Sequence, residues 1–203
     1  MSTCDDCKEF GLSFKRKYSP EEFFASRPTC EVWIVGLNPK DEGNGEDVLS
    51  KEELEMYFSN QNIHSYFKNF KSVSKVLYGS LMDGKVAHTD IVKCLSKKWP
   101  PENISSNGVK KIFTNCTKYL VNQIETNPPK MLICNGAPVS ELIKSIIIPI
   151  KDDKQTSTSY NGVCGGKMIR VILSGFIGRI DVYARRRLGR EIESAARDVG
   201  ITW

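Results

Sequence analysis

The chain has 203 residues, of which 40% are hydrophobic and 26% are charged. This length and composition are typical of one globular domain with a substantial core. No window approaches the roughly 20 apolar residues of a membrane span, and the polar N-terminus has no hydrophobic run of the signal-peptide type. We therefore expect a single domain over residues 1–203 that is soluble, cytoplasmic and monomeric.

The formal net charge is +5, and its distribution is uneven. Four arginines crowd one short segment near the C-terminus: Arg185, Arg186, Arg187 and Arg190. Such a cluster suits an acidic partner such as nucleic acid, because phosphate contacts supply most of the nonspecific affinity. The alternative is a solvated helix face.

Residues 1–29 are polar and mixed in character, and we expect them to form an arm outside the core. They carry the motif Cys4-x-x-Cys7 and a basic patch at residues 15–17. The first apolar, β-branched run covers residues 30–36 and ends in glycine, which predicts a buried strand. A loop follows, since Pro39 and the Asp, Glu and Gly residues after it break regular structure.

Two helices and a second strand are predicted next along the chain. Ser50 and Glu53 have the spacing of a capping box, which predicts a short helix through Phe58. A second helix is expected over residues 66–81. The apolar run at residues 86–92 predicts the second strand.

Residues 107–125 have the periodicity of a helix that packs on a sheet. Its apolar face holds Val109, Ile112, Phe113, Cys116, Leu120 and Ile124. Cys116 is therefore predicted to point inward.

The remainder of the chain predicts two more strands and two more helices. Residues 131–134 form an apolar strand, and a helix follows it as far as Ile146. The polar, Gly-rich residues 151–167 predict a surface excursion or a hairpin. Residues 168–173 form the fourth strand, and the last helix is expected over residues 181–196.

Alternation of strands and helices predicts an α/β fold: a three-layer α/β/α domain around a central, mainly parallel, four-stranded sheet. In such sheets ligands bind beyond the carboxyl ends of the strands. The turns at Asn38, Asp90 and Ser174 follow three of the strands, so we expect them to converge on one cleft.

The chain contains seven cysteines, and we expect it in a reducing compartment, where disulfides are disfavoured. Binding of a metal or a cluster is therefore the favoured role for cysteines with ligand-like spacing. A crossover between the second strand and the next helix would bring Cys94 and Cys116 together with the Cys4-x-x-Cys7 arm. Four thiolates suit either a structural zinc or a [4Fe-4S] cluster, and their spacing alone leaves both open. The other three are Cys30 and Cys134, expected to be small core residues, and Cys164, which has no assigned role.

The run Thr89-Asp90-Ile91-Val92-Lys93-Cys94 resembles the Thr-Asn-Val-Val-Lys-Cys run of the iron-sulfur uracil-DNA glycosylases, known as family 4. That family holds a cluster with an N-terminal Cys-x-x-Cys, the cysteine of this run and one on the next helix. The matching residues here are, in order, Cys4, Cys7, Cys94 and Cys116. The resemblance continues through residues 116–137. It implies a uracil-DNA glycosylase-like fold, DNA as the partner and a structural [4Fe-4S] cluster.

The run Gly36-Leu37-Asn38-Pro39 resembles the Gly-x-Asn-Pro motif of the mismatch-specific and single-strand-selective branches of the same superfamily. Cleavage of an N-glycosidic bond develops positive charge on the sugar and negative charge on the base, so a residue that positions water lowers the barrier. The resemblance implies this role for Asn38. Asp41 or Glu42 could deprotonate the water; the alternative is a solvated loop.

A flipped base needs a stacking face and a reader of its edge. Phe67 is the residue most like the family's stacking phenylalanine, although Phe67 and Phe70 could both be core residues. Leu37, Thr89 and Asp90 are expected beside the base. The family has asparagine where this chain has Asp90, and an ionised aspartate only accepts hydrogen bonds. Either Asp90 is protonated in a dry pocket, or it reads a base edge with more donors, such as the exocyclic amine of cytosine or adenine.

The family's His-Pro-Ser motif is replaced here by the run from Ser174 to Arg179, which contains no histidine. His88 is the nearest substitute; its alternative is a structural or surface role. Phe176 or Ile177 could wedge into DNA. The phosphate and loop contacts are expected from Ser174, Arg179, Arg185, Arg186 and Arg187.

These features support a DNA glycosylase acting on uracil or another deaminated or damaged base. A second hypothesis is an iron-sulfur nucleic-acid-binding protein of the same fold with altered catalysis, which the changed Asp90 and the missing histidine motivate. A third is a zinc-stabilised domain unrelated to DNA.

Overall fold

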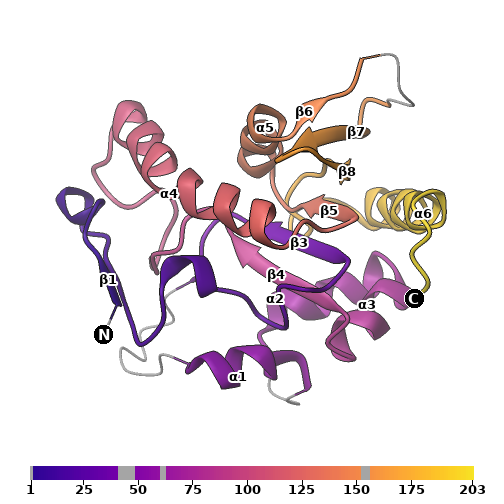
Figure 1. Cartoon of the computed structure of the whole chain (residues 1–203), viewed down its shortest axis with the longest axis horizontal. Helices are drawn as coiled ribbons and strands as arrows, with labels where there is room; N and C mark the ends of the chain where they lie inside the picture. The colour runs from indigo at the N-terminus through magenta and orange to yellow at the C-terminus, as the bar shows by residue number, and fades with distance from the viewer. Residues whose placement is uncertain (1, 41–48, 60–62, 152–155) are drawn as a thin grey trace.

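The computed structural model describes residues 2–40, 49–59, 63–151 and 156–203 (Figure 1). Its main sheet has six strands in the order β4-β3-β5-β8-β7-β6. Their bounds are β3 Val32–Gly36, β4 Val86–Asp90, β5 Met131–Cys134, β6 Ile148–Pro149, β7 Ser159–Cys164 and β8 Lys167–Ile172. The neighbours among β4, β3, β5 and β8 pair in parallel, whereas β7 is antiparallel to both β8 and β6. The fold is therefore mixed α/β with a mostly parallel sheet.

The prediction of a four-stranded sheet was wrong, because the sheet of the described residues has six strands. The hairpin expected in residues 151–167 is β7 paired with β8, and it turns at Gly165 and Gly166, whose φ angles are 57° and 74°. Glycine adopts this left-handed conformation without the steric cost that a Cβ imposes. β6 then pairs with β7 through only two residues, too short a run to be recognised from the sequence.

Six α-helices accompany the sheet in the described residues: α1 Lys51–Glu55, α2 Ser65–Lys68, α3 Lys75–Met82, α4 Ser106–Thr126, α5 Ala137–Ile146 and α6 Val182–Asp198. The capping box at Ser50 and Glu53 is confirmed. The single helix predicted over residues 66–81 is instead α2, the 3-10 helix η4 (Asn69–Ser72) and α3. The break occurs because Ser74 is extended, with φ −148°, and caps α3 by accepting a hydrogen bond from the Leu77 N–H.

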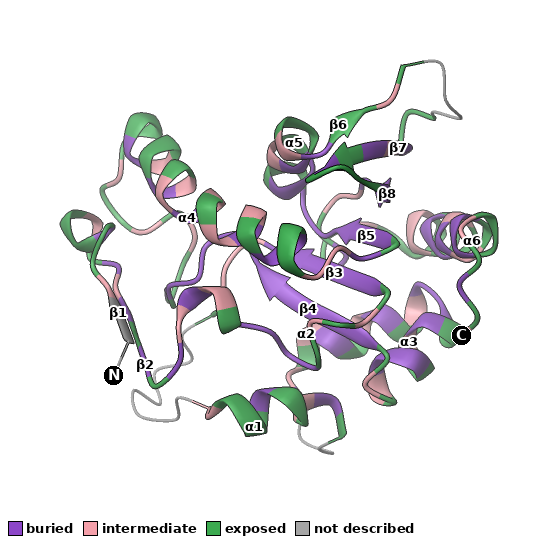
Figure 2. Cartoon of the chain, in the orientation of Figure 1, coloured by how far each residue is buried: buried purple, intermediate pink, exposed green. Residues whose placement is uncertain are grey.

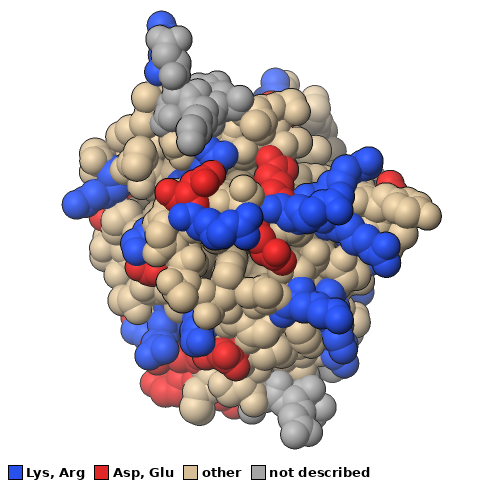
Figure 3. Space-filling view, turned by 90° about the vertical axis from the view of Figure 1, so that its right-hand side faces the viewer, with Lys and Arg blue, Asp and Glu red and all other residues tan. Residues whose placement is uncertain are grey.

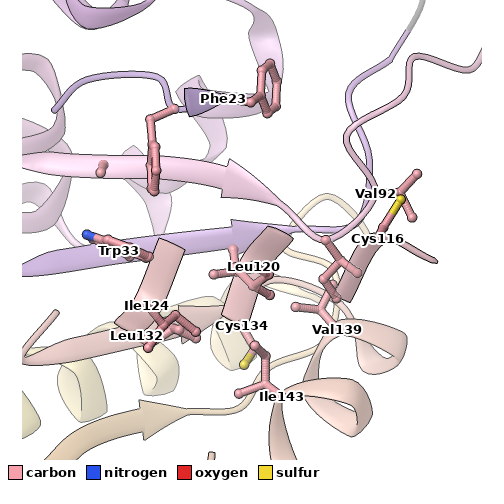
Figure 4. Close-up of a cluster of buried hydrophobic side chains, with 14 of the residues drawn as sticks. Phe23, Trp33, Val92, Cys116, Leu120, Ile124, Leu132, Cys134, Val139 and Ile143 are labelled. Carbon is pink, nitrogen blue, oxygen red and sulfur yellow. The ribbon is translucent and has the colours of Figure 1, made fainter. Parts of the chain in front are cut away.

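Alternating side chains of the central strands build two hydrophobic cores, one on each face of the sheet. Trp33 of β3 and Leu132 of β5 pack in the core under α4 and α5, and Ile34 and Ile133 pack in the core under α3 and α6. Buried residues accordingly fill the central strands in Figure 2. Figure 4 shows the first core, in which side chains of α4 lie against those of β5.

The N-terminal segment is part of the core, so the prediction of an arm outside it was wrong. Its apolar residues are scattered among polar ones in the sequence. They are nevertheless buried in the core on the α4 side of the sheet: Leu12, Phe14, Tyr18, Phe23 and Phe24. The segment also contains the 3-10 helices η1 (Lys8–Phe10) and η2 (Pro20–Glu22) and a small antiparallel sheet of β1 (Ser2–Cys4) and β2 (Phe14–Arg16); η3 (Tyr57–Ser59) follows α1. Ala25 exchanges two backbone hydrogen bonds with His88, which ties the segment to β4.

No helix among the described residues has both the length and the apolar character that a membrane crossing requires.

Candidate functional site

The two sequence motifs meet at the carboxyl edge of the sheet. The loop after β3 runs beside the loop after β4, because the Ile91 N–H donates to the Gly36 carbonyl and the Val92 N–H donates to the Leu37 carbonyl, at 3.1 and 2.9 Å. Parallel pairing of β3 with β4 places Gly36 opposite Asp90. The expected convergence of these two turns is therefore observed.

Strand alternation separates the residues that were expected beside a base. Thr89 lies on the α4 face, where its hydroxyl donates to the Phe23 carbonyl at 2.7 Å, and Leu37 packs on the same face. Asp90 and His88 lie on the opposite face, the one shared with Phe67. The four predicted base-binding residues are thus divided: Phe67 and Asp90 lie on one side of the sheet, and Thr89 and Leu37 lie on the other.

Four rings surround the carboxyl end of β4 on this second face. The His88 ring meets Phe67 and Tyr66 edge to face, with centroids 4.9 and 5.7 Å apart. Tyr66 lies nearly parallel to Phe176, at 6.0 Å and an interplanar angle of 15°. Phe67 is 7% exposed and Phe176 is 42% exposed, so the ring pair that reaches solvent is Tyr66 with Phe176. Tyr66, the immediate neighbour of Phe67, was not singled out from the sequence.

Asn135, directly after β5, connects two parts of this site. Its amide nitrogen donates to the Tyr66 hydroxyl at 2.5 Å, and its amide oxygen accepts from the Ile177 N–H at 2.9 Å. Asn135 is 2% exposed. It therefore fixes Tyr66 relative to the loop after β8, a role that the Asn-Gly dipeptide did not reveal.

Asp90 and His88 form a buried polar pair over Gly36. Asp90 Oδ1 lies 4.0 Å from His88 Nε2. In the described part of the chain the Asp90 carboxylate accepts no hydrogen bond, and buried His88 Nε2 has no partner. A Cβ on Gly36 would lie 2.2 Å from Asp90 Oδ1 and 3.0 Å from His88 Nε2, so only glycine allows this approach.

Burial controls the protonation of the pair. It raises the pKa of Asp90 to about 7, an effect that the nearby Lys93 ammonium opposes. It lowers the pKa of His88 to about 3, so His88 is neutral near pH 7. Burial and the negative charge of Asp90 together raise the pKa of Tyr66.

Lys93 is 1% exposed and anchors the end of β4 to α4. Its ammonium donates to Thr89 Oγ1, the Asp90 carbonyl and Gln123 Oε1, at 2.7, 2.5 and 2.8 Å. Three hydrogen bonds complete the donor capacity of an ammonium group. Lys93 was present in the recognised motif, but its structural role depends on Gln123, which is 30 residues away.

Asn38 belongs to the first motif, and its side chain is held by Pro39 on its own loop and by Ser96 on the loop after β4. Its amide nitrogen donates to the Pro39 carbonyl at 3.0 Å and to Ser96 Oγ at 2.7 Å. These bonds leave the amide oxygen without a protein donor among the described residues. Asp41 and Glu42, the predicted general bases, lie outside the described residues.

The four cysteines singled out by spacing lie near one another. Cys7, Cys94 and Cys116 are buried, and Cys4 is half-buried. A hydrogen bond from Cys116 lowers the pKa of Cys7, and burial with the charges of Cys7 and Cys4 raises the pKa of Cys94 to about 12. Four thiols are the donor set of a zinc or an iron-sulfur site. Within the ranges that the structure describes, no three His, Cys, Asp or Glu side chains have the arrangement of a bound-metal site.

Two residues of α4 donate hydrogen bonds to these sulfurs. The Tyr119 hydroxyl lies 3.1 Å from Cys4 Sγ, and Asn115 Nδ2 lies 3.5 Å from Cys7 Sγ. Such donors stabilise thiolate charge. Cys30, Cys134 and Cys164 lie apart from this group; Cys30 Sγ donates to the Gly84 carbonyl at 3.4 Å.

The residues expected to contact DNA divide into two groups. Phe176, Arg179 and Arg187 are exposed. Ser174 and Arg185 make internal bonds: the Ser174 hydroxyl donates to the Cys134 carbonyl, and the Arg185 guanidinium donates to the Ile180 carbonyl and Ser72 Oγ. Ile177 is fully buried, so its prediction as a wedge was wrong.

The side of the molecule on which α6 lies carries charges of both signs. Figure 3 shows Lys and Arg side chains there in several groups, with Asp and Glu side chains among them. Three arginines at the start of α6 and in its middle are exposed: Arg186, Arg187 and Arg190.

No protein-family model matches the chain, and no curated protein matches it.

The buried pair predicts a pH-dependent difference in stability. The folded-state pKa of Asp90 is above its ordinary value of 3.8, so the folded state binds more protons and Asp90 adds stability as pH falls from about 7. The pKa of His88 is below its ordinary 6.5, so His88 removes stability as pH falls below 6.5. The two effects oppose each other in the wild type.

Asp90→Asn removes only the first effect. We expect this variant to lose about 2 kcal/mol of unfolding free energy relative to the wild type between pH 7 and pH 5. Lys93 loses its counter-charge in the variant, which acts in the same direction. Urea unfolding of both proteins at the two pH values measures the difference, and parallel pH profiles would contradict the burial of an unbonded Asp90 carboxylate.

Proposed function

We propose that the protein is a DNA glycosylase of the uracil-DNA glycosylase superfamily, with the three-layer α/β/α fold of that group. It hydrolyses the N-glycosidic bond of a deaminated or otherwise altered base that is flipped out of DNA. The observation that carries the proposal is the meeting of the Asn38 loop with the end of β4 at the carboxyl edge of the sheet. This edge is where open α/β sheets bind ligands.

Asn38 is the residue proposed to position the attacking water. Ser96 and the Pro39 carbonyl hold its amide nitrogen, so the amide oxygen keeps a fixed direction and is free to accept from water. A positioned water needs no large movement to attack the sugar, which lowers the entropic part of the barrier. Asn38 is not a base, so the water is deprotonated by another group or after attack has begun.

The base is proposed to enter beside Tyr66 and Phe176. Stacking on an aromatic ring stabilises an extruded base without regard to its identity. Asp90 then faces the edge of the base. Exposed Arg179 and Arg187 supply phosphate contacts, which position the strand but carry no sequence information.

Four thiolates are proposed to hold a [4Fe-4S] cluster: Cys4, Cys7, Cys94 and Cys116. The buried thiols, and the Tyr119 and Asn115 donors, suit a group with clustered negative charge. When bound, the cluster supplies cross-links rather than redox chemistry. The protein residues around it join the N-terminal segment and α4 to the loop after β4.

A second function is favoured by the loop after β8. The only hydroxyl of this loop, on Ser174, donates to the Cys134 and Gly175 carbonyls, and the loop has no histidine. It therefore offers neither a histidine nor an uncommitted hydroxyl to stabilise the anion of a departing base. A cluster-bearing protein that binds nucleic acid without cleaving it would fit this arrangement.

One assay separates the two functions. Oligonucleotides containing uracil, hypoxanthine, xanthine, cytosine, 5-methylcytosine or adenine are incubated with the protein, and abasic sites are then cleaved with alkali. For the glycosylase we expect cleavage of at least one substrate and a fall of about 100-fold in rate for Asn38→Ala. Asn107→Ala is the matched control, because Asn107 is exposed on α4.

The contrary result is equally clear. No cleavage of any oligonucleotide, together with binding that weakens as salt is raised, would reject the glycosylase and support the binding protein. An Asn38→Ala rate equal to that of Asn107→Ala would remove Asn38 from the mechanism.

A further inference from the structure

Two polar side chains at the end of β4, His88 and Asp90, are buried and lie close together without a hydrogen bond between them. His88 Nε2 is fully buried and unpartnered, and Asp90 Oδ1 lies 4.0 Å from it. Buried polar atoms are nearly always hydrogen-bonded, and each exception requires an explanation. The separation of 4.0 Å is too long for a hydrogen bond between the two. Both atoms are therefore left for a third group.

The surroundings fix the direction of both side chains. Gly36 lies directly beneath them, and a Cβ there would strike both. The rings of Tyr66 and Phe67 pack on His88, and Asn135 holds the Tyr66 hydroxyl. The two polar side chains thus have fixed positions beside the aromatic rings of Tyr66 and Phe67. An extruded base requires this combination of polar groups for its edge and rings for its face.

We propose that His88 and Asp90 together read the Watson–Crick edge of a base that carries an exocyclic amino group next to an unprotonated ring nitrogen, the edge shared by cytosine-type and adenine-type bases. This inference rests on the proposed base-binding function of the site. The amino group donates to the Asp90 carboxylate, and the His88 Nε2–H donates to the ring nitrogen. His88 Nε2 and the Asp90 carboxylate then each have one hydrogen-bond partner.

The opposite edge fits poorly. For a base held in the same position, uracil and hypoxanthine present a carbonyl oxygen in place of the amino group and a ring N–H in place of the ring nitrogen. Above about pH 7, where Asp90 is ionised, the carbonyl then faces the carboxylate, acceptor against acceptor. A site with a mismatched buried acceptor rejects its ligand strongly, because the polar groups stay unpaired. Burial keeps His88 neutral, with one N–H and one lone pair, which agrees with a donor role toward the ring nitrogen.

Asp90→Asn reverses the pattern of donors. An amide donates to a carbonyl and accepts from a ring N–H, so the variant should prefer uracil-type edges. His88→Phe keeps a ring packed against Tyr66 and Phe67 but removes the N–H donor. The preference for amino-bearing bases should then weaken without reversing.

The test measures binding and cleavage separately. Single-stranded oligonucleotides carry one 2′-fluoroarabino nucleotide, which resists glycosidic cleavage, with cytosine, adenine, uracil or hypoxanthine as its base. Fluorescence anisotropy at constant salt gives the Kd of wild type, Asp90→Asn, His88→Phe and the control Asn107→Ala. We expect the wild type to bind cytosine or adenine at least about 10-fold more tightly than uracil, the size of one well-formed base contact.

Asp90→Asn is expected to invert this ratio, and Asn107→Ala to preserve it. Equal Kd values for all four bases in the wild type, or a uracil preference, would overturn the inference. An unchanged ratio in Asp90→Asn would also overturn it, provided that circular dichroism shows the variant folded. Cleavage of the matching natural oligonucleotides is measured on the same preparations. Cleavage without the expected base preference would reject this inference but would still support the proposed glycosylase. Base-selective binding without cleavage rejects the glycosylase alone.

Discussion

Cys116→Ser is expected to lose the proposed cluster and to lower the free energy of unfolding by about 4–5 kcal/mol, the size associated with loss of a bound metal. Wild-type protein purified without oxygen should be brown and hold about four irons per chain. Cys116 is buried on the inner face of α4 and donates a hydrogen bond to Cys7, so its removal affects both the helix and the N-terminal segment. Iron content and visible absorbance measure the loss of the cluster, and urea unfolding measures the loss of stability.

Cys30→Ser is the matched control. Cys30 lies outside the four-cysteine group, and a serine hydroxyl can still donate to the Gly84 carbonyl. This variant should keep its iron and most of its stability. Colourless wild-type protein loaded with zinc would reject the iron-sulfur cluster, and equal iron in the two variants would remove Cys116 from the ligand set.

Gly189→Ala is expected to destabilise the protein by about 3 kcal/mol, because overpacking against backbone cannot be relieved by a rotamer change. A Cβ on Gly189 would lie 1.9 Å from the Val73 carbonyl oxygen and 2.8 Å from its carbon. Val73 directly follows η4, so the clash separates α6 from the turn that leads into α3. Ser74 Oγ donates to Glu193 Oε1 at 2.5 Å across the same junction, and this bond would be lost as well.

Gly79→Ala provides the control within another helix. A Cβ on Gly79 meets nothing within 4 Å. Alanine is favoured over glycine in a helix interior by about 1 kcal/mol, so this variant should be as stable as the wild type or more so. Thermal and urea unfolding of both variants test the pair; a Gly189→Ala protein as stable as Gly79→Ala would show that α6 does not pack closely on η4.

The two central strands β3 and β5 could be predicted because each is a short, continuous apolar run. β3 and β5 are buried along their whole length, as strands covered on both faces must be, and this pattern is local in the sequence. The edge of the sheet lacked such a pattern. β7 contains exposed and half-buried positions, and its pairing depends on a glycine turn rather than on hydrophobicity.

The candidate site was predicted in part. The motifs indicated Asn38, Asp90 and the four cysteines, since each stands in a recognisable run. Tyr66 and Asn135 were not assigned there, and His88 was offered only as a substitute for the missing histidine. Their contacts join residues more than 20 positions apart, such as Asn135 with Tyr66. Thr89 shows the converse: it stands in the motif, but strand alternation turns it to the other face.

By itself the sequence determined the α/β class, the positions of the central strands, the helix face that carries Cys116 and the order of the four cysteines. These properties are encoded in spacing and local composition. Only the tertiary structure decided which side of the sheet each motif residue faces, that the N-terminal aromatics belong to the core, and that His88 and Asp90 lie unpartnered over Gly36. The reason is physical: such contacts join residues distant along the chain, and they arise only when strand register and helix packing bring those residues together.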